Sequence, residues 1–241
     1  MKPLIALALS LTAFSAQAIT VSGVSISGPD CDSSNTSIAF SPDNATFSIL
    51  YGAMDTTTQG MDRDNSVEQL RAPERKCAIK IGFRPAAGKQ LELQQIDYRG
   101  FVSAPTSQVT GVIESLHRFL GGSVQSGRGR TPSEWLRNGI LLVKQGPFQD
   151  DFVWSARYSP TANDPNNGLH LSNCTGTADF IINTTVRGYT SDINQDVSVV
   201  LDSADGRVGG SQTAIYKIVE KKCDSQNQSR DRICRNRACP N

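Results

Sequence analysis

Short stretches in which apolar and polar residues alternate recur along this chain, and this period of two limits its fold more than any other feature. In residues 77–83, Ile79, Ile81 and Phe83 fall on one side and small or polar residues on the other, as in a half-buried strand. No helix-length amphipathic pattern and no internal repeat interrupts the series. We therefore predict an all-β fold, an antiparallel, jelly-roll-like β-sandwich with long loops. The other predicted strands lie within residues 20–26, 37–51 (two short strands), 91–102, 109–119, 140–144, 152–158, 179–186, 197–201 and 213–219.

One of these stretches changes phase. Leu91 and Leu93 alternate with polar residues, but the next apolar residues of the pattern are Ile96 and Tyr98. A slip of one residue predicts a β-bulge near residues 94–95, because one extra residue returns the apolar side chains to the same face.

A single short helix is predicted over residues 131–139. Thr131 suits the N-cap, Pro132 the first helical position and Glu134 the third, and Gly139 can end the helix.

The segments between strands are polar. Residues 52–75 and 121–130 are expected to form long loops, of the kind that is often functional or disordered. Residues 224–241 hold few apolar side chains and are rich in arginine, so we expect a disordered basic tail outside the core.

The first eighteen residues are typical of a secretory signal. Lys2 supplies the positive charge, residues 4–14 form an apolar run, and Ala16-Gln17-Ala18 fits a small-x-small cleavage site. The run is shorter than the roughly 20 residues that cross a bilayer, and no later stretch could span one. The expected location is secreted or periplasmic, without a transmembrane segment.

Six cysteines follow this signal: Cys31, Cys77, Cys174, Cys223, Cys234 and Cys239. An even number in an oxidising compartment predicts disulfides. Cys234 and Cys239 could close a small loop in the tail, but spacing alone does not choose among the possible pairings. Zinc is not expected, since the chain has no C-x2-C pair and only two histidines.

Charge is nearly balanced, with 24 Lys and Arg against 23 Asp and Glu. This balance argues against a general nucleic-acid or membrane-surface partner.

Several short segments together resemble domain-of-unknown-function family 4360, a family of secreted bacterial and fungal proteins without an assigned activity. The resemblance covers roughly residues 25–223 and implies a secreted, β-sandwich-like domain with Cys31–Cys77 and Cys174–Cys223 as its two core disulfides. It implies no catalytic residue. With the signal at 1–18 and the tail at 224–241, one disulfide-stapled domain is expected over 19–223. The matching segments are Gly28-Pro29-Asp30-Cys31, Ser41-Pro42-Asp43, Arg75-Lys76-Cys77-Ala78-Ile79, Ile96-Asp97-Tyr98-Arg99-Gly100-Phe101, Ser172-Asn173-Cys174 and Asp202-Ser203-Ala204-Asp205-Gly206.

No catalytic motif stands out, and we assign no catalytic residue. His117 and His170 are the only histidines, and no G-x-S-x-G nucleophile elbow is present. Hydrolysis of a sugar needs two carboxylates about 5–10 Å apart, which sequence cannot place. The candidates are Asp97, Glu114, Asp150, Asp151, Asp202 and Asp205.

Asp202 and Asp205 also offer clustered oxygens that could hold calcium, although the EF-hand pattern is missing and a turn explains the same residues. No other cofactor is expected.

These features favour a non-catalytic secreted binding module or envelope-associated protein, whose partner is a carbohydrate, an envelope polymer or another protein. Four aromatic residues could stack on sugars or could equally belong to the core: Tyr98, Trp135, Trp154 and Tyr158. The alternatives are a hydrolase of polysaccharide or peptide, and an inhibitor or effector-like protein that uses residues 121–130 or the tail.

Overall fold

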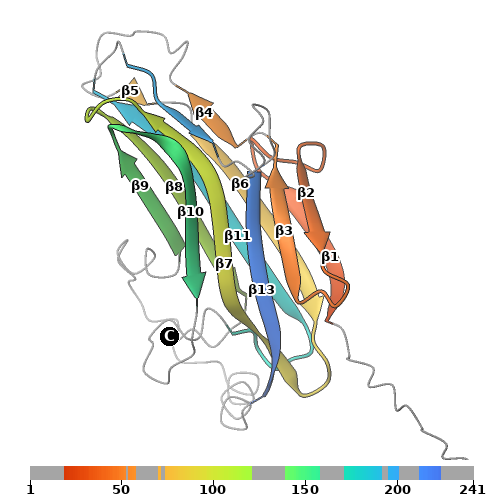
Figure 1. Ribbon diagram of the computed structural model, residues 1–241. Helices are drawn as coiled ribbons and strands as arrows, with labels where there is room; N and C mark the ends of the chain where they lie inside the picture. Colours follow the sequence, from red (N-terminus) through yellow and green to blue (C-terminus); the bar gives the residue numbers. More distant parts are fainter. Residues whose placement is uncertain are drawn as a thin grey trace, which may run out of the picture.

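A computed structural model of the chain describes residues 19–52, 54–57, 70–71, 74–120, 139–157, 171–191, 195–200 and 212–223. Within these residues all regular secondary structure is β-strand. The strands form two antiparallel sheets packed face to face (Figure 1). The all-β sandwich predicted from the alternation is confirmed.

The first sheet has six strands in the order β1-β6-β11-β8-β9, with β5 paired to β11. Every pairing in it is antiparallel. Its strands are β1 (Thr20–Ser27), β5 (Leu70–Arg71), β6 (Arg75–Arg84), β8 (Val109–Phe119), β9 (Gly139–Gln145) and β11 (Ala178–Thr190).

The second sheet has seven strands in the order β2-β3-β13-β7-β12-β4, with β10 paired to β7. Its longest strand, β7, pairs with β13 through its first half and with β10 and β12 further along. The strands are β2 (Thr36–Phe40), β3 (Thr46–Tyr51), β4 (Asp55–Thr57), β7 (Lys89–Ala104), β10 (Phe148–Arg157), β12 (Ser198–Val200) and β13 (Gln212–Lys222).

The chain passes repeatedly from one sheet to the other, as expected for a jelly-roll-like sandwich. Figure 1 shows β1 and β2 along one side of the sandwich and β9 and β10 along the other. The edge strands of the two sheets therefore lie next to each other at both sides.

The strand faces follow the sequence pattern. On β6, Ile79, Ile81 and Phe83 are buried while Lys80 is exposed. The inward side chains of both sheets form one apolar core, as expected when each sheet must bury one face.

The predicted bulge is also present. On β13, Lys217 pairs with Gln95 but the next residue, Ile218, pairs with Leu93, so Gln94 is the extra residue. Leu93 and Ile96 are consequently both buried on the same side of β7.

Residues 52–75 differ from the loop that the sequence predicts. They contain the short strands β4 and β5, and β4 extends the second sheet by pairing with β12. Three residues, Asp55-Thr56-Thr57, are too few to show a hydrophobic alternation, so the pattern could not reveal them. The predicted helix before Gly139, the 121–130 loop and the 224–241 tail lie outside the described residues; Gly139 itself begins β9.

Two disulfides join segments that are distant in the sequence. Cys31 is bonded to Cys77 with a Cα–Cα distance of 5.3 Å, and Cys174 to Cys223 with 5.9 Å. Both pairings are those that the family resemblance implies. Cys234 and Cys239 lie outside the described residues.

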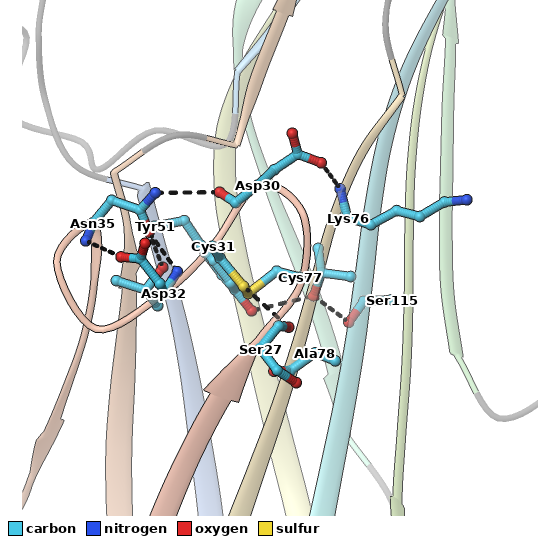
Figure 2. Close-up of a disulfide and its surroundings, with 12 residues drawn as sticks. Ser27, Asp30, Cys31, Asp32, Asn35, Tyr51, Lys76, Cys77, Ala78 and Ser115 are labelled. Atoms are coloured by element: carbon cyan, nitrogen blue, oxygen red, sulfur yellow. Dashed lines mark hydrogen bonds between the residues drawn. A yellow bond between two sulfur atoms is a disulfide. The ribbon is translucent and has the colours of Figure 1, made fainter.

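The loop that carries Cys31 docks on β6, and Figure 2 shows the Cys31–Cys77 disulfide and the hydrogen bond between Asp30 and Lys76 that join them. Beside the disulfide, the Asp30 carboxylate accepts hydrogen bonds from the Lys76 backbone N–H (2.7 Å) and the Arg75 guanidinium (2.8 Å). A Cβ at Gly28, whose φ is +152°, would lie 2.6 Å from the Lys76 carbonyl oxygen. The chain can approach β6 this closely only because residue 28 is glycine.

Candidate functional site

The structure describes two of the four aromatic residues that the sequence offered for sugar stacking, Tyr98 and Trp154, which are cross-strand neighbours on β7 and β10. Tyr98 is 1% exposed and points into the core between the sheets. It therefore belongs to the core, the alternative that the sequence left open, and is not a stacking surface. Trp154 on β10 is half-buried, and its ring meets the edge of the Tyr98 ring at a centroid distance of 6.5 Å. Trp135 and Tyr158 lie outside the described residues.

Tyr98 belongs to a chain of five buried hydroxyl groups that crosses between the two sheets. Tyr51 bonds to Thr184 at 3.1 Å, Thr184 to Ser115 at 3.1 Å, Ser115 to Tyr98 at 2.6 Å, and Tyr98 to Tyr216. The tyrosines come from the seven-stranded sheet and the two smaller residues from the six-stranded sheet. Because buried polar groups are costly unless they are satisfied, the chain favours one relative position of the sheets. Tyr51 and Ser115 lie among the surroundings of the Cys31–Cys77 disulfide (Figure 2).

Burial raises the pKa of all three tyrosines. The pKa values of Tyr51 and Tyr216 are raised well above the usual range and that of Tyr98 is raised, in each case chiefly because the phenolate would lose its hydration. The network is therefore neutral and acts as structural support under β7.

Among the catalytic candidates that the structure describes, His117, Glu114 and Asp97 each have separate surroundings. His117 is 1% exposed, and its ring lies edge-on to Tyr216 in the core. Glu114, on β8 of the other sheet, forms an ion pair with Arg187. Asp97 accepts a hydrogen bond from the Gln95 side chain at 2.8 Å. Asp202 and Asp205, the predicted calcium ligands, and His170 lie outside the described residues.

The outward side of β7 and β10 carries a different set of side chains, which we call the β7–β10 face: Arg99, Phe101, Asp151 and Val153. The strands alternate, so Tyr98 and Gly100 point inward while Arg99 and Phe101 point outward. Arg99 pairs with Val153, and Phe101 pairs with Asp151. Figure 1 shows β7 and β10 side by side along this part of the sandwich.

Phe101 lies at the centre of this face. It is half-exposed, and its cross-strand neighbours are Asp151 on one side and Val200 of β12 on the other. Directly opposed residues have Cβ atoms about 4.5–5.5 Å apart, and residues i and i+2 of a strand lie about 7 Å apart. Arg99 and Ser103 therefore flank the ring along β7. An aromatic ring is thus surrounded by a guanidinium, a carboxylate and a hydroxyl.

Packing against the inward side of β7 holds the Phe101 backbone in place. A Cβ at Gly100 would lie 2.6 Å from the Phe152 ring and 2.6 Å from the Val200 carbonyl oxygen. Phe152 and β12 therefore pack directly against the Gly100 backbone, which holds Phe101 on a rigid strand. Sequence reasoning named Tyr98 but missed Phe101. The alternation of β7 predicts an outward-facing Phe101, because Ile96 and Tyr98 face the core and Phe101 is an odd number of residues from both.

No group of three or more His, Cys, Asp or Glu residues that could hold a metal ion occurs in the described part of the chain. Across the same residues, no helix is long and apolar enough to cross a membrane.

The family model described as domain of unknown function (DUF4360) matches residues 17–223. The chain belongs to the DUF4360 family. No curated protein matches it. Among solved structures, TmCBM61 in complex with β-1,4-galactotriose is similar over 84% of this chain and 90% of that one, at 10% sequence identity and a TM-score of 0.24. A likeness this distant carries no information on what this DUF4360 domain binds.

Several of the segments that carry the family resemblance have structural roles in the fold. The Gly28–Cys31 segment docks on Arg75, Lys76 and Cys77. The Ser172 hydroxyl accepts a hydrogen bond from the Leu91 backbone N–H at 2.8 Å. Ser172 lies two residues before Cys174, which forms the second disulfide. In the 96–101 segment, Ile96 and Tyr98 are core residues. Arg99 and Phe101 differ from these because they project outward from the fold.

Proposed function

We propose that this DUF4360 domain is a secreted, non-catalytic binding module that holds a polysaccharide chain on the β7–β10 face. The observation that carries the proposal is the position of Phe101, a half-exposed ring on a rigid strand with Arg99 and Asp151 beside it. A sugar ring has an apolar C–H face and a rim of hydroxyl groups, so it needs an aromatic surface and charged or polar hydrogen-bonding groups together.

Phe101 and its two charged neighbours can each contact one part of such a ligand. The aromatic face can cover the C–H face of a sugar ring, as it covers other apolar groups. The Asp151 carboxylate accepts hydrogen bonds from hydroxyl groups, and the Arg99 guanidinium donates them. Both charged side chains are exposed, so a sugar could reach them without a conformational change.

The spacing of Asp97, Asp151 and Glu114, all in the described part of the chain, favours binding over hydrolysis by these carboxylates. Asp97 and Asp151 are on the same face, but Asp97 pairs with Ser155 and lies four residues from the Phe101–Asp151 pair. Strand geometry puts their Cα atoms about 14 Å apart, beyond the roughly 5–10 Å that two cooperating carboxylates need. Glu114 lies on the other sheet.

The proposed location is outside the cytoplasm. Two disulfides join distant parts of the domain, and disulfides of this kind form and persist in oxidising compartments. The apolar run and the Ala16-Gln17-Ala18 site of the sequence support export through a secretory signal.

The test is binding of the oxidised protein to a panel of insoluble cell-wall and extracellular polysaccharides, reading both the bound fraction and any released sugar. We expect binding without release to at least one polymer, and Phe101→Ala should weaken it about tenfold or more. Loss of the burial of a phenylalanine ring is worth about 1.5–3 kcal/mol, and each 1.4 kcal/mol is a factor of ten in affinity.

The matched control is Tyr189→Ala, which removes a half-buried aromatic ring from the outward side of β11 in the other sheet. It should leave binding unchanged, provided that circular dichroism shows both variants folded. Release of sugar would contradict a non-catalytic role, and equal binding by the wild type and Phe101→Ala would remove the β7–β10 face as the site.

A further inference from the structure

We propose that the domain forms a two-fold symmetric dimer in which β10 pairs, antiparallel, with β10 of a second copy. This inference goes beyond carbohydrate binding and does not depend on it. It begins from the free edge of β10, since among the described strands β10 is paired with β7 alone.

The other edge strands carry features that protect an edge from pairing with another chain. β1 has a register irregularity between Val21 and Gly23, β9 carries Lys144, and β2 and β4 have only five and three residues. Bulges, lysines and short length all discourage edge-to-edge association. β10 has ten residues in unbroken register with β7 and contains no proline or lysine.

β10 also carries apolar side chains that are exposed or only half-buried. Of the large hydrophobic residues that the structure describes, Val153 is the most exposed, at 68%, followed by Val143 at 51% and Val24 at 44%. Trp154, on the inward side of β10, is also only half-buried. A strand added at this edge would cover the open flanks of both Val153 and Trp154.

The side chains of β10 select one register. In a two-fold pairing centred on Trp154, Asp151 lies opposite Arg157 of the second copy, and the same pair recurs at the other end of the seven-residue ladder formed by residues 151–157. Both side chains are exposed and outward-facing, so opposite charges meet twice.

Centring the pair on Val153 instead would place the Asp150 carboxylate opposite Ala156 within the ladder. The register centred on Trp154 leaves Asp150 outside the paired residues. On the inward side it brings Phe152 opposite Ala156 and the two Trp154 rings opposite each other, which extends the apolar surface of the core across the dimer axis.

The test is the oligomeric state of the full disulfide-bonded chain without any saccharide, measured by sedimentation velocity from low micromolar to near-millimolar concentration. A reversible dimer is expected. Arg157→Asp should raise its dissociation constant at least about tenfold, because two attractive cross-strand pairs become repulsive. The double variant Asp151→Arg/Arg157→Asp restores both pairs with their charges exchanged, so it should recover the wild-type dissociation constant.

Arg118→Asp is the control, since it makes the same charge change at an exposed position on β8 of the other sheet and should leave the dissociation constant unchanged. A protein that stays monomeric at every concentration overturns the proposal. So does a dimer that Arg157→Asp does not weaken, or one that the double variant fails to restore, because the contact would then lie elsewhere. All these outcomes are measured without saccharide, and the proposed polysaccharide site, which shares Asp151 with this interface, is tested separately by binding of Phe101→Ala.

Discussion

Replacement of Tyr51 by phenylalanine tests the buried hydroxyl chain through the pH dependence of folding stability. The Tyr51 hydroxyl bonds to Thr184, which keeps Ser115 as a second partner, and it also lies near the Tyr98 and Tyr216 hydroxyls. The substitution therefore removes one titrating group while most of the network stays satisfied. Its direct cost should be about 1–3 kcal/mol, the penalty for disturbing a buried hydrogen bond.

The magnitude of the pH effect follows from the raised pKa values of Tyr51, Tyr98 and Tyr216. Above about pH 10, tyrosines of the unfolded chain lose their protons while the buried ones keep theirs. The unfolded state then binds fewer protons than the folded state, so the free energy of unfolding falls as pH rises, up to the raised pKa values. Each tyrosine contributes about 1.4 kcal/mol per pH unit, or about 4 kcal/mol for three. In Tyr51→Phe the slope should be shallower by about 1.4 kcal/mol per pH unit.

The assay is urea unfolding followed by far-UV circular dichroism at a series of pH values from neutral to strongly alkaline. Ile182→Val is the control, because it trims a fully buried core residue without removing a titrating group. It should lower the free energy of unfolding by about 0.5–1.5 kcal/mol at every pH and leave the slope unchanged. Equal slopes for the wild type and Tyr51→Phe would refute the assignment of a buried, neutral Tyr51.

Three further substitutions test local features of the fold by chemical denaturation. Replacing both Cys31 and Cys77 by serine should cost about 2–5 kcal/mol, and adding reductant should then have less effect on the variant than on the wild type. Asp30→Ala should cost about 1–3 kcal/mol, since the partly buried carboxylate accepts hydrogen bonds from the Lys76 N–H and the Arg75 guanidinium; an unchanged midpoint would show that the docked loop does not need it. Gly100→Ala should cost about 1–3 kcal/mol through the clash with Phe152, and wild-type stability would mean that this packing is looser than described.

Sequence periodicity predicted the sandwich because each sheet buries only one face. Alternation located most of the strands, and the phase change between Leu93 and Ile96 predicted the bulge at Gln94. It could not find β4, whose three residues are too short to show a period. The disulfide pairing was likewise beyond spacing alone and came from the family resemblance.

The candidate site was predictable only in part. Composition indicated that aromatic residues could bind a ligand, but Tyr98 is a core residue, and the half-exposed ring of this strand is Phe101. Whether a strand residue faces the core depends on its phase, which the apolar neighbours of Tyr98 indicated. The partners of Phe101 on β10 and β12 could not be inferred, because cross-strand register is a property of the folded sheet.

The most direct test of the proposed polysaccharide site is to map a bound oligosaccharide by nuclear magnetic resonance on the isotopically labelled, oxidised protein. The oligosaccharide should be a soluble fragment of whichever polymer the protein retains. We expect saturable amide shifts concentrated at residues 99–103 and 149–153, with outward residues of β8 and β11 unaffected. Shifts concentrated on the six-stranded sheet, or binding that leaves residues 99–103 and 149–153 unchanged, would contradict it.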